Sequence, residues 1–259
     1  MAELNRANRQ VCDVHINDLK TMAPFLEFEN ANTTTAGLTG DSVYAMAKGT
    51  RKIAFQNPLE GTMTIEAQVY PFKFFSLLSD GTMESDAIYP QHETLAAVEA
   101  GKIGLTVTGG TIVAGSVFVY PEGEYGDEAK AIKGAFAEGV FTATTAGDIV
   151  VGTKYEVGML ISVTSGAKRI TFNNDKLPRD YYITMKTLDK DESGTLTPFR
   201  MIAHKASIQR NFELSFASEG DPATVTLTFD ILEDKDGNFF DMIEIADEAE
   251  VTVTDPAEG

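Results

Sequence analysis

The chain has 259 residues, of which 43% are hydrophobic, enough to bury the core of one large β domain or of two smaller ones. Its 39 acidic and 21 basic side chains give a formal charge of −18, which argues against DNA or an anionic membrane as a tightly bound ligand. With a single cysteine, Cys12, the chain can form no internal disulfide, which fits a protein made in a reducing compartment.

The N-terminal part of the chain is predicted to form strands. Residues 9–19, RQVCDVHINDL, alternate polar with apolar side chains, which indicates a first strand. The stretch 30–40 is rich in Asn, Thr and Gly and is expected to be a flexible loop. Residues 51–58 and 61–70 are expected to pair with each other as a hairpin, because an Asn-Pro turn separates the two runs.

One helix is predicted, at residues 70–81, where YPFKFFSLLSDG breaks the alternation. Pro71 suits the first turn of a helix, and three apolar side chains recur at helical spacing: Phe72, Phe75 and Leu78. We expect a short amphipathic α-helix whose aromatic stripe docks on a core.

The composition and the strand pattern of the sequence change between residues 82 and 165. This part combines many Gly and Ala residues with short strand-like runs, which favours a β-rich module inserted into another domain. The predicted organisation is therefore one domain in two parts, 1–81 and 166–259, with the module 82–165 between them.

The longest alternating pattern runs from residue 205 to residue 243 and predicts two long strands around the turn ASEGDPA. Large apolar side chains share one face of these strands: Ile208, Phe212, Leu214, Phe216, Val225, Leu227, Phe229 and Ile231. The other face is rich in Thr, Ser, Asn and Gln, where an ordinary solvated strand would usually carry more Lys and Glu. Plain solvent exposure is one explanation of this polar face, and a specific surface is the other.

The sequence offers little support for catalysis or metal binding. DKDESGTL, residues 189–196, starts with the spacing of an EF-hand, but position twelve is Arg200, where a bidentate carboxylate is required. This segment and the one around Gly237 are interpreted as turns. Three scattered histidines and one cysteine provide no zinc ligand set, and no nucleophile elbow, phosphate loop or dinucleotide fingerprint occurs. We expect no enzyme activity, no cofactor, and no catalytic, cofactor-binding or metal-binding residues.

Two blocks of the sequence resemble the tail tube (major tail) proteins of tailed bacteriophages, of the type found in phages of Gram-positive hosts. The first block is LTGDSVYAMAKGTRKIAFQNPLEGTMTIEAQVYPFKFFSLLSDG, residues 38–81. The second extends from ITFNNDKLPRDYYITMKT to NFFDMIEI, residues 170–245, and its progression KA, ASEGDPAT and LED.DG is the more specific part. Together the blocks cover most of the chain outside the predicted module.

The resemblance implies a mainly β fold, a tail-tube β-sandwich or barrel with one flanking α-helix. It further implies a structural virion protein whose six copies form a ring, with rings stacked into a tube through which DNA passes during ejection. The expected partners are other copies of the chain, a tape-measure protein inside the tube, baseplate and tail terminator proteins, and a sheath protein if the tail contracts. DNA would pass without tight binding, no membrane would be involved, and the protein would be assembled in the host cytoplasm and reside in the virion tail.

Within that resemblance, the polar face of the long hairpin is the candidate lining of the channel. The candidate channel residues are Gln209, Asn211, Glu213, Thr226, Thr228 and Asp230. The polar loop 30–40 is the candidate contact between rings, with candidate residues Asn30, Asn32, Thr33, Thr34, Thr35 and Gly37.

Three alternatives stay open. The chain could be the tube subunit of a contractile injection or type six secretion system, whose cargo is protein. It could be a calcium-dependent β-sandwich binding module, with calcium held at the acidic loops around Asp189 and Asp234. A capsid decoration protein is the third alternative.

Overall fold

The computed structural model describes residues 5–214, 218–220 and 222–245. The prediction of a mainly β fold is confirmed. The chain forms two compact units: the first unit consists of Met1–Thr82 and Thr171–Gly259, and the inserted unit of Met83–Ile170. Among the described residues, no helix has both the length and the apolar character needed to cross a membrane.

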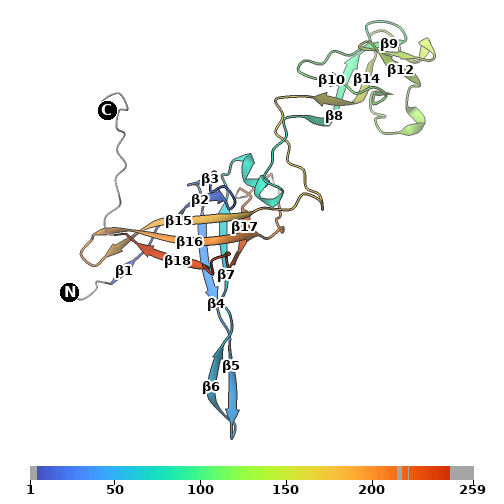
Figure 1. The fold of residues 1–259 in the computed structure, drawn as a ribbon. Coiled ribbons are helices and arrows are strands. Elements are labelled where there is room, and N and C mark those ends of the chain that lie inside the picture. The colour runs from blue at the N-terminus through green and yellow to red at the C-terminus, as the bar shows by residue number, and fades with distance from the viewer. Residues whose placement is uncertain (1–4, 215–217, 221, 246–259) are drawn as a thin grey trace. The chain divides into compact units, whose positions relative to one another are not determined.

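The first unit is built on a nine-stranded antiparallel sheet in the order β3-β2-β15-β16-β17-β7-β4, with β1 paired to β15 and β18 paired to β16 (Figure 1). Its strands are β1 (Arg6–Ala7), β2 (Asp13–Asp18), β3 (Pro24–Phe28), β4 (Thr33–Thr39), β7 (Glu60–Ala67), β15 (Asp180–Asp191), β16 (Leu196–Ile208), β17 (Val225–Leu232) and β18 (Phe240–Glu244).

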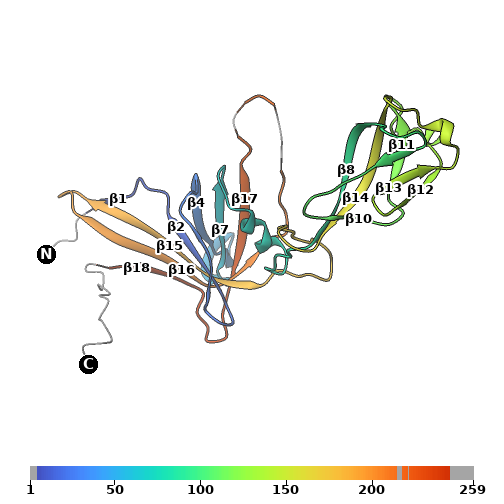
Figure 2. The same ribbon diagram turned by 90° about the horizontal axis from the view of Figure 1, so that it is seen from above.

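This sheet coils so that strands near its two ends share one core. Val14 of β2 and Ile65 of β7 belong to the same buried cluster, although three strands separate them in the sheet order. The backbone N–H of Cys12, just before β2, donates to the Thr34 hydroxyl of β4 over 3.0 Å. The curvature follows from the right-handed twist of the strands, and Figure 2 shows the unit from above.

The helix of this unit, η1 (Phe72–Leu78), is a 3-10 helix, so the predicted α-helix is corrected in type. The Phe74 N–H donates to the Pro71 carbonyl over 2.9 Å, the three-residue spacing of a 3-10 turn. Phe74, Leu77 and Leu78 are fully buried, whereas Phe72 is 45% exposed. Of the predicted stripe, Leu78 is therefore buried and Phe75 is partly buried, whereas Phe72 is replaced in the core by Phe74 and Leu77.

The predicted pairing of residues 51–58 with 61–70 is wrong. Strands β5 (Ser42–Ala47) and β6 (Thr50–Gln56) pair with each other and form a two-stranded arm, residues 42–56, which extends from the sheet in Figure 1. The strands turn at Lys48 and Gly49, whose φ angles of 49° and 77° are typical of the tight turn that joins two strands. Strand β7 instead lies between β17 and β4.

The predicted loop at residues 30–40 is also wrong, because most of it is strand β4. Thr33 to Thr39 pair residue by residue with Glu66 to Glu60 of β7. A threonine-rich edge strand has the composition of a loop, so its sequence alone did not reveal the pairing.

Of the two strands predicted for the long hairpin, the second is confirmed and the first is shorter than predicted. Strand β17 covers Val225–Leu232 with the predicted alternation of buried and less buried residues. Strand β16 ends at Ile208, after which residues 210–214 leave β17. The Arg210 guanidinium donates to the Asn173 carbonyl over 2.9 Å, and the Phe212 ring packs near Phe75. The predicted core residue Phe216 lies outside the described residues.

The inserted unit has its own buried core and two small antiparallel sheets. One sheet has the order β10-β14-β11, with β8 also paired to β14, and the other has the order β12-β13-β9. The elements are β8 (Ala87–Ala96), β9 (Lys102–Gly104), β10 (Thr111–Ile112), β11 (Phe118–Pro121), η2 (Glu128–Lys130), β12 (Gly134–Ala137), β13 (Val140–Ala143), η3 (Ala146–Asp148) and β14 (Lys154–Val163).

Candidate functional site

A threonine-rich surface extends over three neighbouring strands of the first unit. On β4, β7 and β17 the registered rows are Thr33 with Glu66 and Thr226, Thr35 with Thr64 and Thr228, and Gly37 with Thr62 and Asp230. We call these nine residues the threonine face. Since side chains alternate along a strand, the other side of the same strands carries the fully buried Met63, Ile65, Leu227 and Phe229.

The candidate channel residues gather on or beside this face. Thr226, Thr228 and Asp230 belong to it, and the Gln209 side-chain amide donates to the Asp230 carboxylate over 2.7 Å. Asn211 and Glu213 come from the irregular segment after β16 and line a hollow of about 350 Å³ together with Thr226 and Thr228. The structure therefore brings the six candidates together, although three of them, Gln209, Asn211 and Glu213, are not on a strand.

The sequence-based site missed the part of the face that lies on β7. Thr64 and Thr228 face each other, with their hydroxyl oxygens 3.4 Å apart. Thr62, Thr64 and Glu66 share the alternating pattern of β17, so the signal was present in the run TMTIEA. It was overlooked because that run was assigned to a separate hairpin.

The charge of the threonine face is acidic. Glu66 and Asp230 are its two ionisable residues, and none of the nine is basic. Threonine hydroxyls are neutral and short, so the face offers phosphate groups no cation to bind.

The six candidate inter-ring residues lie at or before β4, and not on a free loop. Thr33, Thr35 and Gly37 are part of the threonine face, and Thr34 points to the opposite side, where its hydroxyl accepts from Cys12. Asn30 precedes the strand. Asn32 is held against β7: its N–H donates to the Glu66 carbonyl over 2.8 Å, and its side-chain oxygen accepts from the Gln68 N–H over 2.9 Å.

The arm has one apolar face that no described residue of the first unit covers. Val43 lies opposite Phe55, and Ala45 opposite Ile53, so the four side chains share a face. Val43, Ile53 and Phe55 are 56% to 58% exposed. A two-stranded ribbon is marginally stable by itself in water, and large exposed apolar patches mark interaction sites.

The charge of the arm is opposite to that of the rest of the chain. Residues 42–56 contain Lys48, Arg51 and Lys52 and no acidic residue. Removing this +3 from the total of −18 leaves −21 on the remainder. The Arg51 guanidinium lies 4.3 Å from the centre of the Tyr44 ring, a cation–π contact that fixes one of the three cations on the arm.

Strand β4 is an edge of the nine-stranded sheet, because among the described residues it pairs only with β7. Its outer row of backbone N–H and C=O groups is available to a further strand. The opposite edge strand, β3, is partly covered, since the Lys73 ammonium donates to the Phe25 carbonyl.

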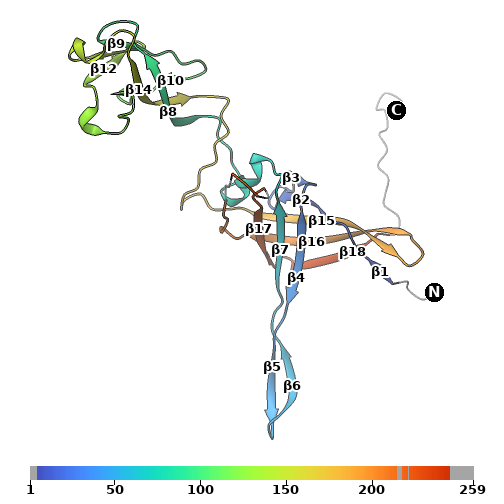
Figure 3. The same cartoon turned by 180° about the vertical axis from the view of Figure 1, so that it is seen from behind.

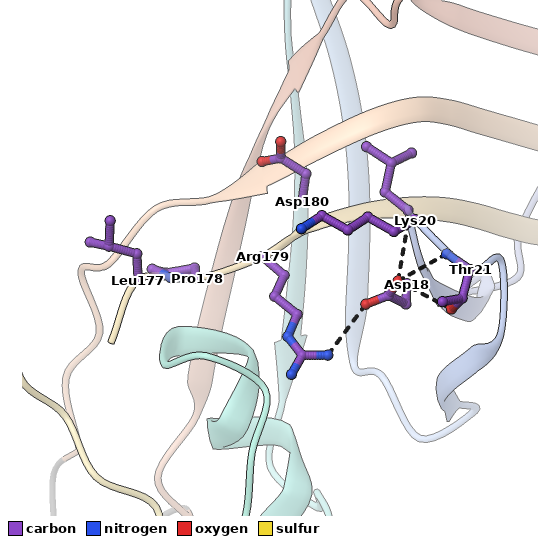
Figure 4. Close-up of a pocket in the computed structure, with 8 residues that line it drawn as sticks. Asp18, Lys20, Thr21, Leu177, Pro178, Arg179 and Asp180 are labelled. Carbon is purple, nitrogen blue, oxygen red and sulfur yellow. Dashed lines mark hydrogen bonds and ion pairs between the residues drawn. The ribbon is translucent and has the colours of Figure 1, made fainter. Parts of the chain in front are cut away.

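A hollow of about 630 Å³ lies where the chain enters β15, and its charged groups have structural roles (Figure 4). The Asp18 carboxylate accepts from the N–H groups of Lys20 and Thr21 and from the Thr21 hydroxyl, and it lies 3.3 Å from the Arg179 guanidinium. Partial burial raises the pKa of Asp18, but these hydrogen bonds outweigh it and hold the pKa below its ordinary value. Asp18 therefore fixes the turn between β2 and β3.

The two acidic loops considered for calcium use carboxylates to close their own turns. Asp191 accepts from the Ser193 hydroxyl over 2.7 Å and from the Thr195 N–H over 2.8 Å, and these hydrogen bonds, led by that of the hydroxyl, lower its pKa. Asp234 accepts in the same way from the N–H and side-chain amide of Asn238. Within the described part of the chain, no three His, Cys, Asp or Glu side chains gather as a metal site would require.

Comparison with known proteins places the chain in a family. No curated protein matches it. The model of the YomU/Tube protein family matches residues 9–245, which include both units and all six candidate channel residues. The chain therefore belongs to the YomU/Tube protein family, and its predicted relationship to phage tail tube proteins is confirmed.

Proposed function

We propose that six copies of this chain close into a ring, that rings stack as a phage tail tube, and that the threonine face lines the channel for DNA. The observation that carries the channel proposal is the alignment of polar residues in rows over three strands, of which Thr35, Thr64 and Thr228 form the middle row. A monomer gains little from so wide a polar, cation-free face, whereas a channel needs one that DNA can pass without adsorbing.

Electrostatics supports this role. Six copies with a charge of −18 carry −108 in total, and the threonine face contributes Glu66 and Asp230 from each copy. Repulsion between these carboxylates and phosphate keeps the genome in motion, while cations at the same positions would hold it.

Ring closure is assigned to sheet edges. The unpaired outer edge of β4 is available to a strand of the neighbouring copy, and repetition around a closed ring satisfies every such edge. The contact is heterologous, since the edge of one copy meets a different surface of the next.

Contact between rings is assigned to the arm, in place of residues 30–37. Asn32 and the threonines of β4 are held in the sheet, whereas the arm exposes Val43, Ile53 and Phe55. In the virion, the channel would hold the tape-measure protein before DNA. Baseplate and terminator proteins would close the two ends, and a sheath protein would surround the tube of a contractile tail.

The first experiment is negative-stain electron microscopy of the purified chain over a range of protein and salt concentrations. Rings with a central hole, alone or stacked, are the expected result. Monomers at every concentration, especially monomers that calcium stabilises, would overturn the proposal and favour a binding module instead.

A further inference from the structure

A second exposed apolar surface lies at the end of β7 that is farther from the arm. The arm leads through residues 57–59 into the first residue of β7, and residues 68–71 join the last residue of β7 to η1. Eight strand residues separate these ends, a distance of about 26 Å. Figures 1 and 3 show the arm and η1 on opposite sides of the nine-stranded sheet.

This second surface combines three separate segments of the first unit. Phe72 and Phe75 come from η1, Phe172 from the chain before β15, and Phe212 from the segment after β16. The ring centres are 6.2 Å apart for Phe72 and Phe75, 6.0 Å for Phe75 and Phe212, and 5.7 Å for Phe172 and Phe212. We call these four residues the aromatic patch.

The aromatic patch is open to solvent, with Phe72, Phe172 and Phe212 between 38% and 46% exposed. It is also held in place, since the Arg210 guanidinium ties the segment carrying Phe212 to the Asn173 carbonyl next to Phe172. The ordered exposure of several neighbouring rings is typical of an interaction surface.

Resting on the proposed function, we infer that the apolar face of the arm packs on the aromatic patch of another copy, in the next ring. Val43, Ile53 and Phe55 supply the aliphatic and aromatic side chains that fit between exposed phenyl rings. Because the two surfaces lie at opposite ends of β7, copies displaced along the direction of β7 satisfy both. Each copy then gives one arm and receives one.

The charge of the arm favours a second copy of this chain as its partner. The arm carries +3, and the remainder of each chain carries −21, so the arm is attracted to the body of another copy while two arms repel each other. Glu213, exposed next to Phe212, provides a carboxylate at the rim of the patch for Lys52.

The contact is tested by disulfide formation between two different variants. In a Cys12→Ser background, Phe55→Cys on the arm is mixed with Phe72→Cys on the patch, and the mixture is allowed to assemble and is then oxidised. We expect a covalent dimer in the mixture and not in either variant alone. In the matched control, Leu196→Cys replaces Phe72→Cys. Leu196 lies away from the patch and is more exposed than Phe72, at 57% against 45%, and this control is expected to give no dimer.

The first pair removes Phe55 and Phe72, which belong to the proposed contact and whose loss could itself prevent assembly. A second pair of cysteines avoids this problem. Lys52→Cys with Glu213→Cys places the thiols at the polar rim and leaves every aromatic ring in place. Tubes that form without a disulfide in both pairs would overturn this inference and leave the proposed function standing. Dimers of Phe55→Cys with itself would overturn it as well, because they would show arm-to-arm pairing. Failure of the unmodified chain to form rings or tubes would instead count against the proposed function.

Discussion

The Gln209 side chain donates a hydrogen bond to Asp230 over 2.7 Å at the point where β16 and β17 separate. Before Gln209, the residues of β16 up to Ile208 pair in register with β17. After Gln209, residues 210–214 depart toward η1. The pair thus marks the boundary between the sheet and the segment that carries Phe212 into the aromatic patch. It also uses one carboxylate oxygen of the threonine face to hold that boundary.

If the threonine face lines the channel, reversing its charge should make assembled tubes retain DNA. Glu66→Lys combined with Asp230→Lys replaces the two carboxylates of the threonine face with ammonium groups in every copy, so assembled tubes are expected to bind short duplex DNA at low salt. Binding should weaken steeply between about 50 and 200 mM salt, because phosphate contacts release counterions. Co-sedimentation of tubes with labelled DNA measures this. Glu124→Lys with Glu128→Lys makes the same change of charge in the inserted unit, and equal DNA binding by that control would remove the case for the threonine face.

The core beneath the face should be far more sensitive than the face itself. Phe229 is fully buried, and Phe229→Ala is expected to lower the free energy of unfolding of the first unit by about 3 to 5 kcal/mol. Its neighbour Thr228, on the polar side, should tolerate alanine with a change of about 0.5 kcal/mol or less. Urea unfolding of both variants tests the assigned orientation of β17, which a larger loss for Thr228→Ala would contradict.

The arm should matter for assembly and not for folding. Ile53→Ser with Phe55→Ser removes two large side chains from its apolar face, and neither contributes to the buried core. We expect the unfolding midpoint of the monomer to stay unchanged and tubes to disappear from electron micrographs. Gln56→Ala alters the polar face of the same arm and should leave tubes intact. Tubes of normal length from the double variant would exclude the arm from the contact between rings.

Acid should loosen the turn between β2 and β3. The pKa of Asp18 is lower in the folded chain than its reference value of 3.8, so its charged form stabilises the fold above that pH. This stabilisation is lost as the pH falls through the folded-state pKa, in the range below about 4. Asp18→Asn should therefore be less stable than the parent at pH 7, and the difference should shrink at pH 3. Urea midpoints at both pH values provide the test, and a difference independent of pH would contradict the assignment.

The inserted unit should be removable. It has a separate buried core, and the chain enters and leaves it side by side, with the Glu84 and Arg169 backbones joined by two hydrogen bonds of 2.9 Å. Replacing residues 87–163 with a Gly-Ser-Gly linker is expected to leave a first unit that unfolds cooperatively and still forms tubes. Circular dichroism melting and electron microscopy report the two properties. A shortened chain without a cooperative transition would mean that the units depend on each other to fold.

Periodicity predicted the elements in which burial on one face dominates. Val225 to Ile231 alternate strictly and pack into the core as predicted, because only a half-buried strand satisfies such a pattern. The same principle located the candidate channel residues on β17. It could equally have found Thr62, Thr64 and Glu66, whose alternation is as clear.

Pairing partners could not be predicted in the same way. Alternation states which side of a strand is buried and does not state which strand lies next to it, so β7 was joined to β6 when it lies between β17 and β4. Strand β4 was missed because its inward residues Thr34 and Ala36 are small and only half-buried. The departure of residues 210–214 depends on Arg210 and on ring contacts with Phe75 and Phe172, which are distant in sequence.

The position of the arm before β7, and of η1 after it, gives every copy a direction. A rod of copies that all point the same way has two chemically different ends, one with basic, apolar ribbons and one with bare phenyl rings. The two ends then grow through different contacts. A new copy brings its phenyl side chains to one end and its two-stranded ribbon to the other. Proteins that stop growth at the two ends would need opposite surface chemistry, and neither could replace the other.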